Sequence, residues 1–516
     1  MSLLIALALA AAAPPAGSCQ AALGPLHEGV EEARLPGRVD GATIASAEAL
    51  VALRRARGDA LITVVGGSFA GASFNGERLT NICFIETNLA GSRWQGAEAN
   101  GVGFIRANLT RADLTGAKLR GILMRESEMA GADASGADLT GGKVDGGWNG
   151  SFEGMRLDRA NLTEFAFDCG ITIADGCPLD RRISMRGADL TGADLADYWL
   201  ESDWRGARVD RTRVSLPQLR DLGTAAIDGP VLVDGGDLEV ALSPADYRLL
   251  LPAIRDANVA QSPSFDCARA SSEVERRICL PIGASIRLDD RNLAILYRQA
   301  VGRDPAVADR QRAWLRERDR CAQRPDEEKD RCIAEAYERR RSELIARLGA
   351  PDWASPGAVA LFVEPQVEFE ESFRSTPLYT RLIPAIKGSA SARVVVRVNA
   401  DGSLDAAGDA VGANAHLCSL GAERLRFDPA TGWFSALRSP DLEAPPQFRG
   451  KPIPVLRLFG DRAEVWRGGQ GGLSEGEDPR VGDYASCGVR ASFPEMIRVP
   501  VTLAEARQLF EDYEDR

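Results

Sequence analysis

The sequence predicts a multidomain α+β protein, made of a β-solenoid, then a disulfide-stapled all-α domain, then a small β-rich domain. Three observations predict it: large residues recur every five positions through the first half, four cysteines lie in one helical stretch, and short strand-like runs fill the last third. A chain of 516 residues, 26% charged and 45% hydrophobic, has the length and composition of several folded domains.

Charge and histidine content limit the classes of function. The 62 Lys and Arg against 74 Asp and Glu leave a net charge of −12, which disfavours nonspecific binding to nucleic acid or anionic lipid. The chain has two histidines, His27 and His416, too few for chemistry that needs several imidazoles. His416 is expected to be a polar strand residue. We find no nucleophile–base set, nucleotide fingerprint or metal-ligand cluster, so we expect no catalytic, cofactor-binding or metal-binding residues and a protein that is not an enzyme.

An apolar run opens the chain. After Met1 and Ser2 come eleven apolar residues, LLIALALAAAA, then Pro14, a pattern typical of a secretory signal peptide although no basic residue precedes the run. We expect residues 1–18 to direct export to the periplasm or beyond. The text AGSC, ending at Cys19, is similar to a degraded bacterial lipobox, and a lipid anchor at Cys19 is an alternative that we do not favour. No later run is long enough to span a bilayer as a helix.

Ten cysteines in an exported chain predict disulfides, because an oxidising compartment lets them persist. Cys19 and Cys83 are left over from the pairs that position suggests, and Cys83 is either an unpaired surface thiol or bonded to Cys19. The four cysteines of the helical stretch allow three pairings, which all stay open. The disulfide candidates are Cys169 with Cys177, Cys418 with Cys487, and the group Cys267, Cys279, Cys321 and Cys332.

The five-residue period is the clearest pattern in the chain. Large side chains stand on a five-residue grid from Phe69 to Val144, interrupted by Ala99 and Ala134, and a small residue usually lies two positions before each. A period of five fits neither a helix nor a strand, so it predicts a solenoid in which each pentad forms one side. The period breaks at the loop of Cys169 and Cys177, resumes, and slips by one residue before Trp204.

The text ANLTRADLTGAKLRG, which begins at Ala107, resembles the pentapeptide-repeat family. The resemblance implies a right-handed quadrilateral β-helix whose Leu-type and Ala-type residues point inward. Ile82, Val102 and Ile122 support four sides independently, because residues twenty apart would stack in successive coils. The 28 pentads then make seven coils, and a spacing of about 4.8 Å between strands gives a rod roughly 34 Å long.

The ends of such a rod need caps, since the terminal coils would expose core and unpaired strand edges. A helix over 46–57 and the strand run LITVV should cap the first coil, and residues 215–223, which carry an early Pro, should close the last. Some pentapeptide-repeat proteins inhibit DNA gyrase by imitating DNA. Residues 66–220 carry 18 Lys and Arg against 21 Asp and Glu, too close to neutral for such a mimic. We therefore expect a scaffold or binding rod that contacts no nucleic acid.

The four-cysteine stretch is typical of packed amphipathic helices. Ser272 and Glu275 form a capping box, and apolar residues recur at intervals of three and four. The stretch resembles the lysozyme inhibitor LprI-like family, a small exported helical domain with four cysteines. The resemblance is carried by Phe265-Asp266-Cys267, the E-x-x-I-C unit at Glu275–Cys279, Leu288-Asp289, Tyr297, the run Gln311–Cys321, Cys332 and Tyr337.

This resemblance implies a lysozyme-like muramidase as the protein partner. Residues 264–348 have a net charge of +3, which does not favour a basic partner such as lysozyme. Trp and Arg are common at binding hot spots, so one short run is the candidate contact surface, with a core position of Trp314 as the alternative. The candidate partner-binding residues are Trp314, Arg316, Glu317, Arg318 and Asp319.

The last third is predicted to be β-rich. ARVVVRVNADGSL predicts a strand followed by an Asp-Gly turn, VLRLFGDRAEVWRGG predicts a hairpin with a Gly-Asp turn, and Thr502 with Glu505 should cap a terminal helix. The whole chain is expected to be an exported cell-envelope binding protein, a lysozyme inhibitor displayed on a rod, or alternatively a non-catalytic periplasmic scaffold. The expected boundaries are a signal peptide 1–18, an N-terminal cap 19–65, the β-helix 66–223, a connector 224–262, the helical domain 263–350 and the β-rich domain 351–516.

Overall fold

The computed structural model describes most of the chain and divides it into two compact units. The first unit takes Met1–Ile254 and Glu371–Ser389, and the second takes Arg255–Glu370 and Ala390–Arg516. The described residues are 17–23, 35–145, 151–168, 183–196, 202–236, 238–254, 262–280, 284–412, 416–439, 442–466, 479–488 and 491–514. Residues 1–16 of the expected signal peptide, and Cys169 with Cys177, lie outside them.

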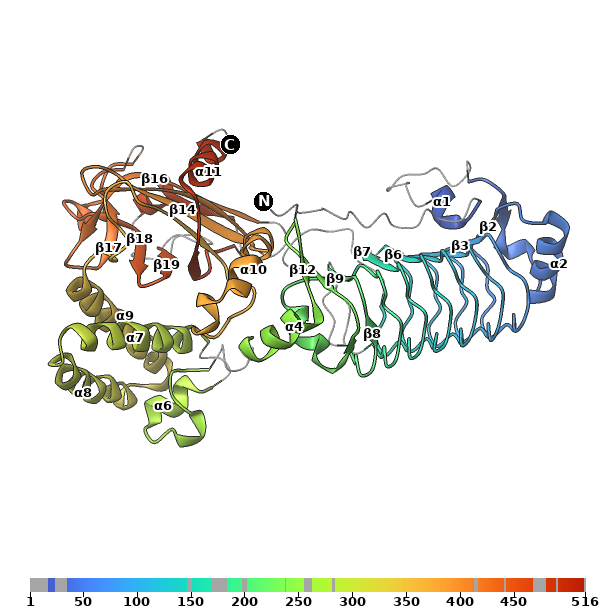
Figure 1. Cartoon of the computed structure of the whole chain (residues 1–516), viewed down its shortest axis with the longest axis horizontal. Coiled ribbons are helices and arrows are strands. Elements are labelled where there is room, and N and C mark those ends of the chain that lie inside the picture. Colours follow the sequence, from blue (N-terminus) through green and yellow to red (C-terminus); the bar gives the residue numbers. More distant parts are fainter. Residues whose placement is uncertain are drawn as a thin grey trace. The chain divides into compact units, whose positions relative to one another are not determined.

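A β-solenoid makes up most of the first unit (Figure 1). Seven short strands stack in parallel and in chain order along one side of the rod. From β2 to β6 the paired residues lie twenty apart, as Ile62 and Ile82 do, so each coil takes four pentads. The strands are β1 (Arg38–Asp40), β2 (Ile62–Val65), β3 (Ile82–Ile85), β4 (Gly103–Ile105), β5 (Leu123–Arg125), β6 (Lys143–Asp145) and β7 (Ala166–Asp168).

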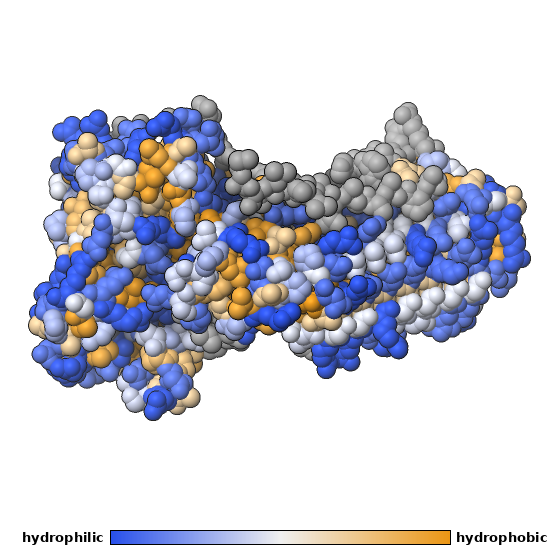
Figure 2. All heavy atoms as spheres, in the orientation of Figure 1, coloured by the Kyte–Doolittle hydropathy of each residue, from blue (hydrophilic) through white to orange (hydrophobic). Residues whose placement is uncertain are grey.

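The grid residues fill the rod, as the period predicts. From Phe69 to Val144 every one is buried, and so are Ala99 and Ala134. Phe84 stacks on Phe104 of the next coil with ring centroids 5.6 Å apart. Further along, Asp189 pairs with Arg208, nineteen positions on, which is the one-residue slip expected before Trp204. Hydrophilic side chains cover most of the visible outer face of these coils (Figure 2).

Helix α2 (Ala47–Arg57) caps the first coil, and Ser46 accepts a hydrogen bond from the Ala49 amide at its start. The buried Arg54 ties the helix to the coil, because it donates to the Thr80 carbonyl at 2.8 Å and the Ala60 carbonyl at 2.6 Å. This end of the rod is built as the sequence predicts. Before α2 come α1 (Cys19–Leu23) and the 3₁₀ turn η2 (Gly41–Thr43).

The other end of the rod differs from the expected cap at 215–223. A short helix and 3₁₀ turn do form there, but the strands continue beyond them, and the stack ends where β12 pairs antiparallel with β11. An antiparallel strand ends the solenoid because its direction cannot carry the chain into another coil. The elements are β8 (Arg208–Val209), β9 (Thr212–Val214), α3 (Gln218–Asp221), η3 (Leu222–Thr224), β10 (Ala226–Ile227), β11 (Val231–Asp234), β12 (Glu239–Leu242), α4 (Pro244–Leu250) and η4 (Leu251–Ala253).

A distant segment completes this end of the rod. Helix α10 (Pro377–Gly388), preceded by η8 (Phe373–Ser375), belongs to the first unit and packs on β11 and β12. A Cβ at Gly388 would stand 1.7 Å from the Gly235 carbonyl oxygen, so the two backbones touch directly. Arg381 donates to the Ala241 carbonyl at 2.9 Å. The boundaries expected from the sequence put these residues in the β-rich domain. They belong to the first unit instead, because they pack on β11 and β12, which lie far from them in sequence.

The second unit combines a helical region with a β-barrel (Figure 1). The helical region contains η5 (Cys267–Arg269), α6 (Glu273–Ile278), α7 (Ala284–Arg303), α8 (Val307–Arg318), η7 (Asp319–Gln323) and α9 (Asp326–Leu348). Ser272 and Glu275 form the predicted capping box of α6. Tyr337, Leu293 and Leu296 are among the buried residues of its core.

The predicted β-rich segment forms an antiparallel barrel. Among the described strands eight close into a ring, because β15 pairs with both β14 and β16, and β20 pairs with β16 outside the ring. The expected turns at Asp401-Gly402 and Gly460-Asp461 connect β14 to β15 and β18 to β19. The elements are β13 (Val359–Val363), β14 (Ala392–Val398), β15 (Leu404–Val411), β16 (Leu417–Asp428), β17 (Trp433–Ala436), η10 (Pro446–Phe448), β18 (Ile453–Phe459), β19 (Arg462–Val465), η11 (Pro479–Asp483), β20 (Ala485–Cys487), β21 (Met496–Val499) and α11 (Leu503–Glu514).

Candidate functional site

The eight cysteines in the described ranges are all paired. In the helical region each cysteine pairs with its neighbour in sequence, one of the three arrangements that the sequence leaves open. Cys418 and Cys487 face each other across β16 and β20. The four bonds are Cys19–Cys83, Cys267–Cys279, Cys321–Cys332 and Cys418–Cys487.

Cys83 is not an exposed thiol, although its side chain does point outward from the rod. Helix α1 covers it, and the Cys19 amide donates to the Gly101 carbonyl at 2.9 Å. Gly103 makes room for this contact, because a Cβ there would stand 2.2 Å from the Cys19 sulfur. The same sulfur of Cys19 cannot carry a lipid while it is in this bond. The apolar outer residues that α1 helps to cover are Val65, Cys83, Ile85, Ile105 and Leu123.

One of the three series of isolated bridges along the rod carries charges of alternating sign. Arg78, Glu98, Lys118 and Asp138 occupy equivalent positions in four successive coils. Opposite charges therefore lie above one another along the rod. This series therefore forms no continuous negative stripe.

The candidate partner-binding run of α8 divides between core and surface. Trp314 is buried, packs edge-on against Tyr337 with centroids 5.2 Å apart, and donates from Nε1 to the Ala336 carbonyl. Arg318 is also buried and donates to the Tyr337 hydroxyl at 3.1 Å. Arg316 and Glu317 are exposed, and Asp319 is half-buried. Trp314 thus lies where the alternative interpretation puts it, because its ring completes the helical core.

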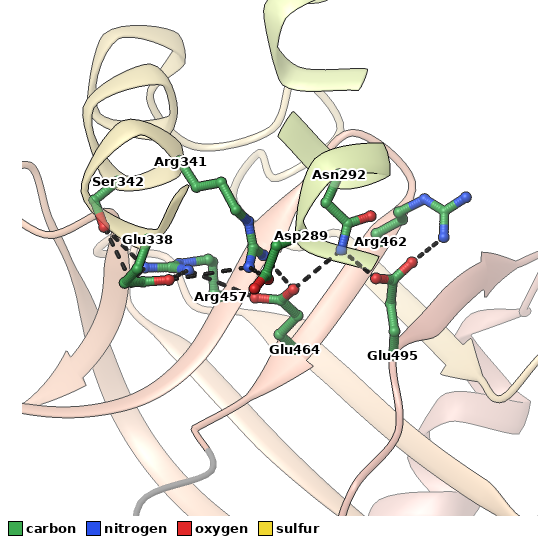
Figure 3. Close-up of polar contacts among 9 residues, drawn as sticks. All are labelled: Asp289, Asn292, Glu338, Arg341, Ser342, Arg457, Arg462, Glu464 and Glu495. Carbon is green, nitrogen blue, oxygen red and sulfur yellow. Dashed lines mark hydrogen bonds and ion pairs between the residues drawn. The ribbon is translucent and has the colours of Figure 1, made fainter. Parts of the chain in front are cut away.

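Arg457 is the centre of a buried ionic interface between the helical region and the barrel (Figure 3). It lies on β18, is fully buried, and donates to Glu338 Oε2 and Ser342 Oγ of α9, each at 3.0 Å. Its guanidinium also lies 4.1 Å from the centroid of the Trp433 ring. A buried charge is very costly without partners, so these contacts hold α9 against the barrel. The charge and hydrogen bonds of Arg457 outweigh burial and hold the pKa of Glu338 below its ordinary value.

Arg341, also on α9, makes a second set of buried contacts. It donates to Asp289 of α7 at 2.7 Å and to Glu464 of β19. Burial disfavours the charged form, but Glu464 and Asp289 outweigh it and raise the pKa of Arg341 above its ordinary value. The interface continues through Asn292, which donates to Glu464 and Glu495, and through the ion pair of Arg462 with Glu495.

An open groove of about 890 Å³ lies beside the ionic interface, between α9 and the barrel. We call it the α9 groove. Ser342 and Glu338 belong to both, so the ionic interface sets the position of the helical wall (Figure 3). The helical wall is mostly polar, with Glu338, Arg339, Ser342, Glu343, Ala346 and Arg347. The barrel wall is richer in apolar side chains, with Asp428, Ala430, Thr431, Trp433, Ser435, Phe448, Lys451, Pro452, Pro454 and Trp466.

Neither the ionic interface nor the groove is predicted from the sequence. One signal for the interface was visible, because Arg457 interrupts the apolar run IPVLRLF, and a cation in a buried strand needs a partner. The groove had no comparable signal, since its walls come from residues about a hundred positions apart. His416 is half-buried beside Gly488. Within the described ranges, no group of three or more His, Cys, Asp or Glu is placed to hold a metal ion. None of the described helices is long and apolar enough to cross a membrane.

Comparison with known proteins bears on the rod. The family model described as pentapeptide repeats, with 8 copies, matches residues 82–121 and 107–143. A comparison with curated proteins gives no match.

Three solved structures illustrate the similarity. A pentapeptide repeat protein of the Arabidopsis thaliana thylakoid lumen is 28% identical over 20% of this chain and 68% of its own, with a TM-score of 0.18. The plasmid-mediated fluoroquinolone resistance protein QnrB1 is 19% identical over 34% of this chain and 83% of its own, with a TM-score of 0.23. HetL, a pentapeptide repeat protein involved in heterocyst differentiation regulation in the cyanobacterium Nostoc, is 21% identical over 32% of this chain and 89% of its own, with a TM-score of 0.13.

The period, the coils of twenty residues and the family model agree that residues 82–143 of the rod are pentapeptide repeats.

Proposed function

We propose that the chain is an exported, non-catalytic binding protein of the cell envelope, whose rod spaces or presents a ligand-binding helix–barrel unit. The observation that carries the binding role is the α9 groove, whose volume of about 890 Å³ is typical of ligand sites. Export is supported by the apolar start of the sequence and by the paired state of the eight described cysteines, since disulfides persist in oxidising compartments. The proposal keeps the domain boundaries expected from the sequence, except that residues 371–389 are assigned to the rod.

Inhibition of a lysozyme-like muramidase is the more specific form of this proposal. It is supported by the resemblance of residues 263–350 to the LprI-like family. Because Trp314 and Arg318 are buried, Arg316 and Glu317 would supply the contact from α8. The alternative is a scaffold in which the rod binds another envelope protein and the helix–barrel unit is an adaptor.

The first experiment is titration of lysozyme activity on cell walls with the purified, oxidised full chain. Stoichiometric inhibition that weakens in the double variant Arg316→Ala, Glu317→Ala would support the specific form. No inhibition and no binding to lysozyme would sink it and favour the scaffold. Ionic strength adds a second readout, because a contact steered by charge weakens with salt whereas an apolar contact does not.

A further inference from the structure

The α9 groove has two unlike walls, and each one matches part of a ligand. On the barrel wall, the rings of Trp433 and Trp466 meet edge to face with centroids 4.9 Å apart. Trp466 and Phe448 are half-buried and line the groove, whereas Trp433 is almost wholly covered and packs against the Trp466 ring. An aromatic ring face beside polar groups suits a ring-shaped ligand with a polar edge.

The helical wall supplies hydrogen-bonding groups instead. Ser342 and Glu343 lie on it one turn from Arg339 and Arg347, so hydroxyl, carboxylate and guanidinium groups follow one another along α9. Several of these are already paired, as Glu343 is with the buried Arg340 at 2.7 Å. They offer their remaining lone pairs and N–H groups, which suits hydroxyls better than it suits a second apolar surface.

Lys451 is the cation of the barrel wall, which also carries Asp428. Its ammonium lies 6.0 Å from the centroid of the Phe448 ring, at the exposed edge of the barrel wall. Among the described residues no carboxylate forms an ion pair with it, whereas Glu338 is committed to Arg457 and Asp428 accepts from Thr431. A ligand that stacks on Phe448 and Trp466 would thus bring its outer substituent to a cation.

We infer that the α9 groove binds an acidic sugar: a pyranose whose C–H face stacks on Trp466 and Phe448, whose hydroxyls bond to α9, and whose carboxylate pairs with Lys451. The C–H groups of a pyranose face suit the negative face of an aromatic ring, and its equatorial hydroxyls point sideways toward the helix. Two sources share this chemistry, uronic-acid chains and glycans of muramic acid. The inference deepens the proposed binding role and is independent of lysozyme inhibition.

In the test, calorimetry measures the affinity of the oxidised full chain for two matched pairs of probes. Trigalacturonic acid is compared with galactotriose, and the disaccharide of N-acetylglucosamine and N-acetylmuramic acid with chitobiose, so that the acid of each pair carries carboxylate that its neutral partner lacks. We expect at least one acid to bind about tenfold more tightly than its neutral partner, and the pair that does so identifies the source.

Variants assign the roles within the groove. Trp466→Ala should abolish binding, and Trp466→Phe, which keeps a ring, should retain part of it. Lys451→Gln should remove the preference for the acid. Arg449→Gln, which removes an exposed cation two residues away from Lys451, is the matched control and should have no effect.

Three outcomes would overturn the inference. Equal affinity for acid and neutral probes would remove the role of Lys451. Undisturbed binding by a folded Trp466→Ala variant would place the site elsewhere. Binding of a proline-rich peptide at the groove with no binding of any sugar would show a peptide site. The last outcome would contradict the sugar site but not the binding role of the α9 groove. Failure of the lysozyme titration alone would contradict lysozyme inhibition but not the sugar site.

Discussion

Arg457 and Arg341 show how single buried charges organise the second unit. Each is almost without solvent contact, and each pairs with a carboxylate from the opposite side of the interface, Arg457 with Glu338 and Arg341 with Glu464. Such pairs contribute little net stability against a well-packed apolar alternative, but removing one partner leaves the other buried and uncompensated. The pairs therefore specify the position in which α9 packs on the barrel.

Replacing Glu464 with Gln should destabilise the second unit by about 3 kcal/mol, because Arg341 then loses a carboxylate that is itself mostly buried. Denaturant unfolding of the full chain, followed by a signal from the helices, would measure it. Glu335→Gln is the control, since Glu335 is exposed and lies 3.9 Å from Arg339, and it should change stability by less than about 0.5 kcal/mol. Equal losses in the two variants would contradict the role given to the interface.

The same residues predict a dependence on pH. The folded pKa of Glu338 lies below its ordinary value of 4.5, because Arg457 stabilises the carboxylate more than burial opposes it. Its contribution to stability is thus complete above pH 4.5 and is lost as the pH falls through the folded pKa. We therefore expect the denaturant concentration at the midpoint of unfolding to decrease as the pH is lowered below 4.5, and to decrease less in the Glu338→Gln variant. If the Glu338→Gln variant loses as much stability at low pH as the parent chain does, Glu338 does not contribute to the pH dependence of stability.

At the scale of elements, the N-terminal helix α1 is attached to the outside of a rod that is otherwise built from one repeat. Its contact needs a strand residue without a side chain at Gly103 and a disulfide partner at Cys83. Both lie at outward positions, where the repeat itself does not restrict the residue type. They form a local adaptation of the rod to the segment that covers it.

Gly103→Ala should prevent the close approach of Cys19, because the added Cβ would stand 2.2 Å from the Cys19 sulfur and 2.7 Å from the Cys19 Cβ. We expect two additional free thiols per chain, counted by alkylation and mass spectrometry after oxidative folding. Gly421→Ala is the matched control, because Gly421 is a strand glycine at which an added Cβ would meet no atom within 4 Å, and this variant should stay fully oxidised. A fully oxidised Gly103→Ala variant would show that α1 docks in another way.

At the scale of the whole molecule, each unit is assembled from two stretches of the chain that are separated in sequence. Residues 371–389 belong to the rod, and the helical region shares Phe459, Arg457 and Glu464 with the barrel. Domains expected to follow one another along the sequence therefore interleave.

The helical region should not be a self-sufficient module. A fragment of residues 263–350 leaves Arg341 without Glu464 and removes Phe459 from its core, so we expect it to lose about 3–5 kcal/mol of stability relative to a fragment of residues 262–516. Hydrogen exchange of α7 and α9 in both fragments would measure the loss. Equal protection would show that the barrel contributes nothing to the helices.

The sequence by itself determined the repeat, since a period of five that alternates large and small residues has one way to bury them. It also determined the helix after Ser46, the caps at Ser272 and Thr502 and the tight turns of the barrel, because these depend on residues within a few positions of one another. Other features depend on residues from 64 to more than a hundred positions apart. They are the pairing of Cys19 with Cys83, the ion pairs of Arg457, the packing of α10 on the rod and the two walls of the α9 groove. Only the tertiary structure decided those, because a buried charge or an open groove is completed by whichever distant segment packs against it.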